Sequence, residues 1–195
     1  GDGFYVLIDP TDNNFVYAEY QYGGFARSTN GGNSFNYGLN GVSGSDRFNW
    51  STPYIIDPTN PEKLYLGTHK VYKSTNRAAS WTAISPDLTN GPPSGNQVYG
   101  TITTLAAAAS DTNVVYVGTD DGNLWVTLDG GANWTNISAS LPVRWVTRVA
   151  VDPYNAMVAY ATLSGYRYDE YLPHVFRTTD AGTSWQDISS NLPEA

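Results

Sequence analysis

Few side chains in this sequence have the types and spacing that chemistry requires. The chain has no cysteine, which excludes disulfide scaffolds, cysteine zinc sites and thiol catalysis. Its two histidines, His69 and His174, lack His-x-x-x-His or Glu-x-x-His spacing, so we expect no metal site. The run 120–123 (Asp-Asp-Gly-Asn) lacks the alternating acids and closing Glu of a calcium loop and predicts a hairpin turn. We therefore expect neither metal nor cofactor, and aromatic rings and carboxylates are the groups left to explain.

An internal repeat organises the aromatic residues. Four segments, 28–35, 74–81, 127–134 and 178–185, share a Ser or Thr, then an Asn or Asp two positions later, then small residues and a final aromatic. We call these segments the box hairpins. Their polar residues are Asn30, Asn76, Asp129 and Asp180, and their aromatic ends are Phe35, Trp81, Trp134 and Trp185, spaced 46, 53 and 51 residues apart. Upstream of the boxes lie Tyr17, Tyr65, Tyr116 and Tyr160, and Asp-Pro precedes three of these, at Asp9, Asp57 and Asp152.

Each unit of about 50 residues reads as four short strands. In the second unit the expected strands are 54–56, 64–68, 71–74 and 81–84, and in the third the small-residue run 105–109 reads as a buried strand. A four-stranded sheet at this period is typical of a β-propeller blade, which must stack on neighbours to bury its faces. We predict an all-β fold, a propeller segment of four four-stranded blades that forms an arc of a larger propeller. Residues 1–195 form this single segment, with repeats roughly at 1–45, 46–95, 96–142 and 143–195.

We assign the box hairpins a structural role, because a plan that recurs in all four units is unlike a binding site, which usually occurs once. The Asn or Asp side chain can bond to backbone N–H groups of its own turn, and Gly32, Gly131 and Gly182 can supply a positive φ. We expect the aromatic residue to pack beneath the turn. The second box, with Arg77 and Ala78 at its centre, departs most from the plan.

Charge and hydropathy exclude several partners. The net charge is -8, from 18 acidic and 10 basic residues, and no basic patch indicates nucleic acid. No run reaches the roughly 18 apolar residues that a membrane helix needs, and the start lacks a signal-peptide profile. The many Asn, Thr, Ser, Gly and Tyr residues favour a secreted β protein, extracellular or at the cell surface and bacterial.

The box hairpins resemble the Asp-box, Ser/Thr-x-Asp-x-Gly-x-x-Trp. This motif is found in bacterial neuraminidase (BNR) repeats, in sortilin-type propellers and in xyloglucanases of glycoside hydrolase family 74. Segments 117–125 and 146–153 look most like large bacterial secreted proteins described as BNR-repeat or sortilin-like glycosyl hydrolases. The resemblance implies the fold, whereas enzymes, receptors and scaffolds all carry the motif.

The resemblance to family 74 implies a catalytic aspartate after a Val-Tyr-Ala strand and before a hydrophobic-Gly-Gly turn. The matching stretch, 16–25, has Gln21 at that place, and an amide cannot act as a general base. Glu19 shares a strand face with Gln21 by alternation, and Glu19 and Asp2 are the two candidates for a catalytic carboxylate. A sialidase is not favoured, because no arginine has the context of the triad that such enzymes use. We therefore expect a non-catalytic module, with part of a family 74-like polysaccharide hydrolase as the alternative.

Two groups of residues are candidates for recognition of a glycan or a protein. Seven positions before each Asp-Pro stand Asp2, Trp50 and Trp145, with Tyr99 near the same phase of the third unit. These positions precede the innermost strands, so their rings would surround one mouth of the channel and stack on a ligand. The alternative is that the Trp residues pack between blades. The second group lies in the long connection 164–174, which is either a contact loop or an ordinary surface loop. Its members are Tyr166, Arg167, Tyr168, Asp169, Glu170 and Tyr171.

An open arc of four blades leaves its terminal faces uncovered. Those faces would be apolar, so we expect further blades or a partner subunit to close the propeller.

Overall fold

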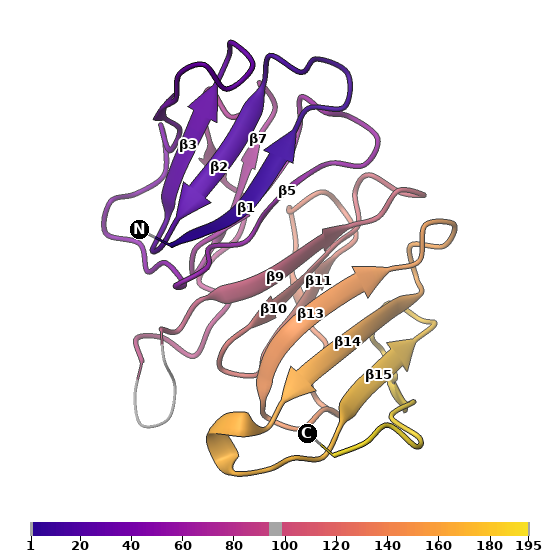
Figure 1. Ribbon diagram of the computed structural model, residues 1–195. Coiled ribbons are helices and arrows are strands. Elements are labelled where there is room, and N and C mark those ends of the chain that lie inside the picture. The colour runs from indigo at the N-terminus through magenta and orange to yellow at the C-terminus, as the bar shows by residue number, and fades with distance from the viewer. Residues whose placement is uncertain (1, 94–98, 195) are drawn as a thin grey trace.

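The computed structural model describes residues 2–93 and 99–194, and this part of the chain is all-β (Figure 1). Its strands form four antiparallel sheets of four, each a meander of consecutive strands. Blade 1 contains β1 (Gly3–Ile8), β2 (Val16–Tyr20), β3 (Gly24–Ser28) and β4 (Asn36–Tyr37). Blade 2 contains β5 (Tyr54–Ile56), β6 (Leu64–Gly67), β7 (Val71–Ser74) and β8 (Thr82–Ala83). Blade 3 contains β9 (Ile102–Ala107), β10 (Val115–Thr119), β11 (Leu124–Thr127) and β12 (Thr135–Asn136). Blade 4 contains β13 (Trp145–Val151), β14 (Ala159–Ser164), β15 (His174–Thr178) and β16 (Gln186–Asp187).

The prediction of four four-stranded blades is confirmed, with differences at the ends of the elements. The outermost strands have only two residues each, and the strand expected at 105–109 is β9, which ends at Ala107. A 3₁₀ turn, η1 (Tyr166–Tyr168), lies in the connection where no helix was expected. The repeat boundary expected at 95 and 96 lies outside the described residues.

The blades stack in chain order through three apolar layers, one between each pair of neighbours. Successive side chains of a strand point to opposite faces of its sheet, and the tyrosine near the start of each second strand illustrates this. Tyr17, Tyr65 and Tyr116 are fully buried against the following blade. Residues on either side of these tyrosines, such as Leu64 and Leu66, face the preceding blade instead. Each of the first three blades therefore contributes one face of its second strand to the layer that follows it.

The box hairpins have the same backbone in all four blades. The two central residues of each box have positive φ, including Arg77 at 55° and Ala78 at 57° where glycine is missing. In blade 3, Asp129 Oδ1 accepts the backbone N–H of Asn133 at 2.8 Å, and Thr127 Oγ1 accepts that of Gly131 at 2.9 Å. Equivalent bonds occur in the boxes of blades 1, 2 and 4. The side chains thus satisfy N–H groups that a tight turn leaves unpaired, which holds the left-handed residues in place.

The sequence predicted that the box tryptophans pack beneath their own turns. In the structure they also make a hydrogen bond to a neighbouring blade. Each indole Nε1 donates to a backbone carbonyl of the preceding blade. Trp81 donates to Gly38 at 2.7 Å, Trp134 to Ile84 at 2.8 Å and Trp185 to Ile137 at 2.9 Å. In blade 1 the box ends in Phe35, which is exposed and has no side-chain N–H to donate. The tryptophan of the box therefore links each of blades 2, 3 and 4 to the blade before it by a hydrogen bond.

The two ends of the sheets carry different features. Because each blade is an antiparallel meander, the first strand begins at the end where the second strand turns into the third. The turns of β2–β3, β6–β7 and β10–β11, the connections between blades and η1 lie at this end, which we call the mouth end (at the left in Figure 1). The box hairpins and Asp-Pro turns lie at the opposite end, the box end. The separation places recognition candidates and box hairpins on opposite sides of the molecule.

Candidate functional site

Aromatic rings from three blades meet at the mouth end. The ring of Tyr22, in the β2–β3 turn, lies edge-on to Trp50 at 5.0 Å between centroids and to Tyr99 at 5.9 Å. Phe4, on β1, lies edge-on to Trp50 at 6.3 Å. Trp50 is 37% exposed and Tyr22 is 49% exposed, so both present ring surface to solvent. The structure therefore brings Trp50 and Tyr99 together through a tyrosine that the sequence had not singled out.

Blade 4 adds a cationic edge to this group. The guanidinium of Arg167, in η1, lies over the ring of Trp145 at 5.4 Å. Burial and the Tyr22 hydroxyl raise the pKa of Tyr99, while the charge of Arg167 opposes this rise and thus acts across the mouth. We call Phe4, Tyr22, Trp50, Tyr99, Trp145 and Arg167 the aromatic mouth. Trp145 is half-buried, and Arg167 lies over one face of its ring.

The long connection of blade 4 walls two neighbouring hollows. One has a volume of about 230 Å³ and is lined by Trp145, Thr147, Ser164, Tyr166 and Arg167. The other, of about 410 Å³, shares three of these residues and extends along Glu170, Tyr171, Leu172 and Pro173. Tyr168 and Asp169 are exposed and line neither hollow. Four of the six predicted loop residues therefore border a groove, and the other two lie outside it.

Ion pairs fix the shape of this connection. Arg144 Nε donates to Glu170 Oε2 at 2.5 Å, and the same oxygen lies 3.2 Å from His174 Nε2. The hydrogen bond from Arg144 lowers the pKa of Glu170 most, and His174 lowers it further. The Arg144 guanidinium also lies 4.3 Å from the ring centroid of Tyr168. The loop is thus tied to the start of β13 by charge and by a cation–π contact.

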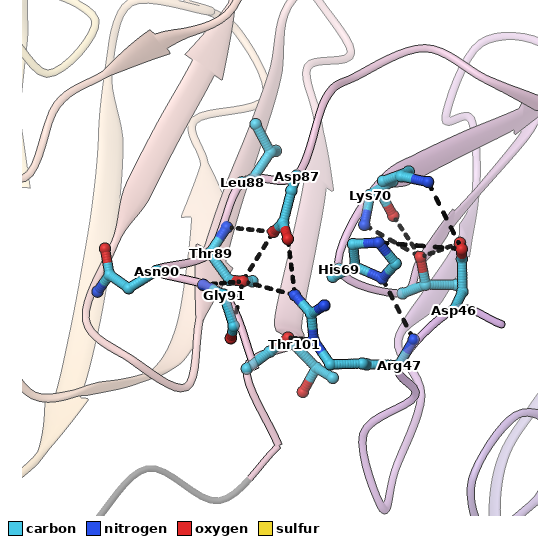
Figure 2. Close-up of polar contacts among 12 residues, drawn as sticks. Asp46, Arg47, His69, Lys70, Asp87, Leu88, Thr89, Asn90, Gly91 and Thr101 are labelled. Atoms are coloured by element: carbon cyan, nitrogen blue, oxygen red, sulfur yellow. Dashed lines mark hydrogen bonds and ion pairs between the residues drawn. The ribbon is translucent and has the colours of Figure 1, made fainter. Parts of the chain in front are cut away.

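A polar network under the mouth joins the connections that carry Trp50 and Tyr99 (Figure 2). Arg47 Nε donates to the carbonyl of Gly100 at 2.9 Å, and its Nη2 donates to Asp87 at 2.8 Å and to Thr89 at 2.9 Å. Its backbone N–H donates to His69 Nδ1 at 3.2 Å. Arg47 is three residues before Trp50, and Gly100 follows Tyr99, so this side chain joins the loops of the two rings. Asn49 joins the same loops, since its Nδ2 donates to Thr101 Oγ1 at 2.9 Å.

The next residue in this network, Asp46, is a buried carboxylate with several partners. It accepts hydrogen bonds from Thr68 Oγ1 at 2.9 Å and Tyr72 Oη at 2.7 Å, and Lys70 Nζ lies 3.6 Å away. Burial lowers the pKa of His69, so its neutral ring accepts from Arg47 and its Nε2 faces Asp46 at 3.9 Å. Asp46 is therefore a structural anchor of the 38–53 connection, fully engaged by protein groups.

The two catalytic candidates differ in their surroundings. Glu19 is buried, and the nearby backbone of Tyr5 and Thr52 and the side chain of Ser51 only partly oppose the effect of burial on its carboxyl group. Burial raises its pKa to about 8. Asp2 is exposed, and its backbone N–H donates to Gln21 Oε1 at 3.0 Å. Of the two candidates, Glu19 is buried and protonated at neutral pH, whereas Asp2 is solvated. The side chain of Gln21 accepts the Asp2 backbone N–H.

Two members of the site were missed from the sequence. Tyr22 begins a Tyr-Gly-Gly turn, and Arg47 lies in a loop that looked featureless. Only the aromatic richness of 20–25 could have pointed to Tyr22. Across residues 2–93 and 99–194, no three His, Cys, Asp or Glu side chains gather as metal ligands would. The same residues contain no helix long and apolar enough to cross a membrane.

Comparisons with curated proteins find xyloglucanases. No protein-family model matches the chain. It is 28% identical over 219 residues to a probable oligoxyloglucan-reducing end-specific xyloglucanase of Neosartorya fischeri, covering 95% of this chain and 26% of that protein. It is 24% identical over 200 residues to the oligoxyloglucan-reducing end-specific xyloglucanase of Emericella nidulans, covering 94% and 23%. The chain therefore spans about a quarter of the length of these curated relatives.

Solved structures agree on the architecture. The xyloglucanase of glycoside hydrolase family 74 from Xanthomonas campestris aligns with a TM-score of 0.71 and 21% identity, over 100% of this chain and 31% of that one. YCF48 from Cyanidioschyzon merolae aligns with a TM-score of 0.57 and 14% identity, over 100% and 61%. The fold is that of a β-propeller. The chain is an arc of such a propeller.

Proposed function

We propose that this chain is an extracellular recognition segment of an Asp-box propeller that binds a polysaccharide through the aromatic mouth. The observation that carries the proposal is the meeting of Trp50, Tyr22 and Tyr99 as partly exposed rings at the mouth end. Flat rings stack on the apolar faces of sugars and lose little conformational entropy. The xyloglucanases among its relatives support a glucan as the ligand.

The non-catalytic part of the proposal rests on the carboxylates. Glycoside hydrolysis requires two carboxyl groups that flank the scissile bond. Glu19 is buried behind the mouth and Gln21 takes the place that the resemblance gives to an aspartate. Further blades or a partner subunit complete the propeller in this proposal, and residues 1–195 act as a single segment.

The test is binding of xyloglucan and of an unsubstituted β-glucan by isothermal titration calorimetry. We expect Trp50→Ala and Trp145→Ala to weaken binding about tenfold each, since an aromatic contact is worth about 1 kcal/mol or more. Tyr154→Ala is the matched control, because Tyr154 is an exposed ring in a turn at the box end. Unchanged affinity in both tryptophan variants would remove the aromatic mouth from the proposal.

The alternative is that the chain is part of a polysaccharide hydrolase. The protonated Glu19 favours it, because a general acid must hold a proton at working pH. Release of reducing ends from xyloglucan, abolished by Glu19→Gln or Asp2→Asn, would establish this alternative and contradict the non-catalytic function. Binding without turnover would support the recognition function.

A further inference from the structure

The three internal blade interfaces share one polar contact. The box tryptophan of each later blade donates its indole N–H to a carbonyl of the earlier blade, at Gly38, Ile84 and Ile137. Each acceptor residue directly follows the outermost strand of its blade. A buried carbonyl without a partner costs free energy, so this contact favours a tryptophan in the docking blade.

Blade 4 has the same acceptor position at Ile188. Ile188 follows β16, and its N–H donates to Val175 at 2.9 Å, as Ile84 does to Val71 at 2.9 Å and Ile137 to Leu124 at 2.8 Å. The backbone at Ile188 is therefore placed as in the blades whose carbonyl accepts an indole.

The apolar part of the interface is repeated as well. Tyr17, Tyr65 and Tyr116 are 0% exposed because the following blade covers them, whereas Tyr160, at the same position of β14, is 36% exposed. Blade 4 thus presents the ring and the carbonyl that blades 1, 2 and 3 use to receive a neighbour.

The internal interfaces also show which residues a blade needs in its box to dock on the blade before it. Gly131 lies so close to Ile84 that a Cβ there would stand 2.8 Å from its Cδ1, and Gly182 is similarly close to Ile137. Blade 1 has the required glycine, Gly32, but ends its box in Phe35, which is 43% exposed and has no donor. A second copy of this chain therefore lacks the tryptophan that would complete the contact.

We propose that the outer face of blade 4, formed by Tyr160, Val175 and Ile188, is a docking surface for a further four-stranded blade that carries a tryptophan at the end of its box. The inference rests on the arc described above and deepens the proposal that further blades complete it. It does not depend on glycan binding.

The experiment supplies the missing tryptophan on this chain. Phe35→Trp gives blade 1 the indole, so head-to-tail self-association through the blade 4 face should tighten at least tenfold in sedimentation equilibrium. Phe35→Tyr is the matched control and should behave as the unmodified chain, because it adds a polar atom without the indole geometry. Adding Tyr160→Glu to Phe35→Trp should abolish the gain by placing a charge on the receiving face.

The outcomes separate the two proposals. The proposal is overturned if the Phe35→Trp variant self-associates no more tightly than the Phe35→Tyr variant. It is also overturned if the tighter association of Phe35→Trp persists when Tyr160→Glu is added. Because Phe35 is exposed, the substitution leaves the interior unchanged, and thermal unfolding verifies this. Phe35 and Tyr160 lie outside the aromatic mouth, so the glycan titration of the same variants reports on the proposed function independently.

Discussion

At the scale of single residues, Glu19 departs most from the pattern of the repeats. The equivalent positions in blades 2 and 3 are Gly67 and Gly118, where a Cβ would collide with Ile102 and Val146 of the next blade. In blade 1 the position faces Thr52 and holds a buried carboxyl instead. Burial makes ionisation of this carboxyl group costly, and the nearby Tyr5, Ser51 and Thr52 offset only part of that cost.

This residue predicts a pH dependence of stability. The pKa of Glu19 rises from 4.5 unfolded to about 8 folded, so the folded state holds an extra proton between these values. Its contribution is complete below pH 4.5, and the free energy of unfolding then falls as pH increases to 8, by a few kcal/mol. Glu19→Gln should remove this decline in urea unfolding at pH 5 to 8.5. Glu194→Gln, at an exposed position, should retain it, and equal slopes for all three proteins would show that Glu19 ionises freely.

At the scale of elements, the mouth depends on connections rather than on strands. Trp50 and Tyr99 lie in loops between blades, and Arg47 joins these loops by donating to Gly100 and Asp87. At the box end a second arginine has an equivalent structural role. Arg77 pairs with Asp9 of blade 1 at 2.8 Å and with Glu62 at 2.7 Å. Although burial raises the pKa of Asp9, the Arg77 hydrogen bond and the Thr11 bonds lower it to about 2.

The two arginines therefore form a matched pair for an experiment. Arg47→Met should weaken glucan binding about fivefold to tenfold, because the loops of Trp50 and Tyr99 lose the Arg47 bond that joins them and keep only that of Asn49. Arg77→Met removes the interblade ion pair with Asp9 and the pair with Glu62 within blade 2, both far from the mouth. It should lower the thermal midpoint while leaving the dissociation constant unchanged. Calorimetric titration and thermal unfolding of both variants distinguish positioning from general stability. If both variants lose affinity in proportion to their stability, Arg47 has no positioning role.

At the scale of the whole molecule, the arc has two covered blades and two half-covered ones. Blades 2 and 3 have neighbours on both faces. The outer face of blade 1 exposes Val6, Ile8, Tyr20 and Tyr37. The first and last innermost strands also approach each other, since Arg148 Nη1 donates to Tyr5 Oη at 3.4 Å. In such repeat architectures stability is the sum of each blade and its interfaces.

Hydrogen exchange should follow this arrangement. Amides of β6 and β10 should exchange at least tenfold more slowly than those of β2 and β14, because opening a central blade breaks two interfaces. The second strands are matched controls for one another, since they occupy the same place in each blade. Mass spectrometry of peptic peptides measures the difference, and uniform protection across the four strands would indicate a single cooperative unit instead.

The sequence by itself determined the number of blades, their four strands and the turn chemistry of the boxes. These follow from local rules, because strand alternation, positive φ at glycine and side-chain bonds within a turn depend on residues close in the chain. Trp50, Tyr99 and Trp145 could be nominated because they hold equivalent places in the repeat.

Only the tertiary structure decided what these residues contact. Three features depend on groups tens of residues apart, whose distances no local pattern contains: Tyr22 and Arg167 join the mouth, Arg47 joins two of its loops, and Glu19 is protonated. The box tryptophans show the same limit. Their place within the turn is local, whereas their hydrogen bond to the preceding blade exists because stacking brings one unit's carbonyl to the next unit's indole.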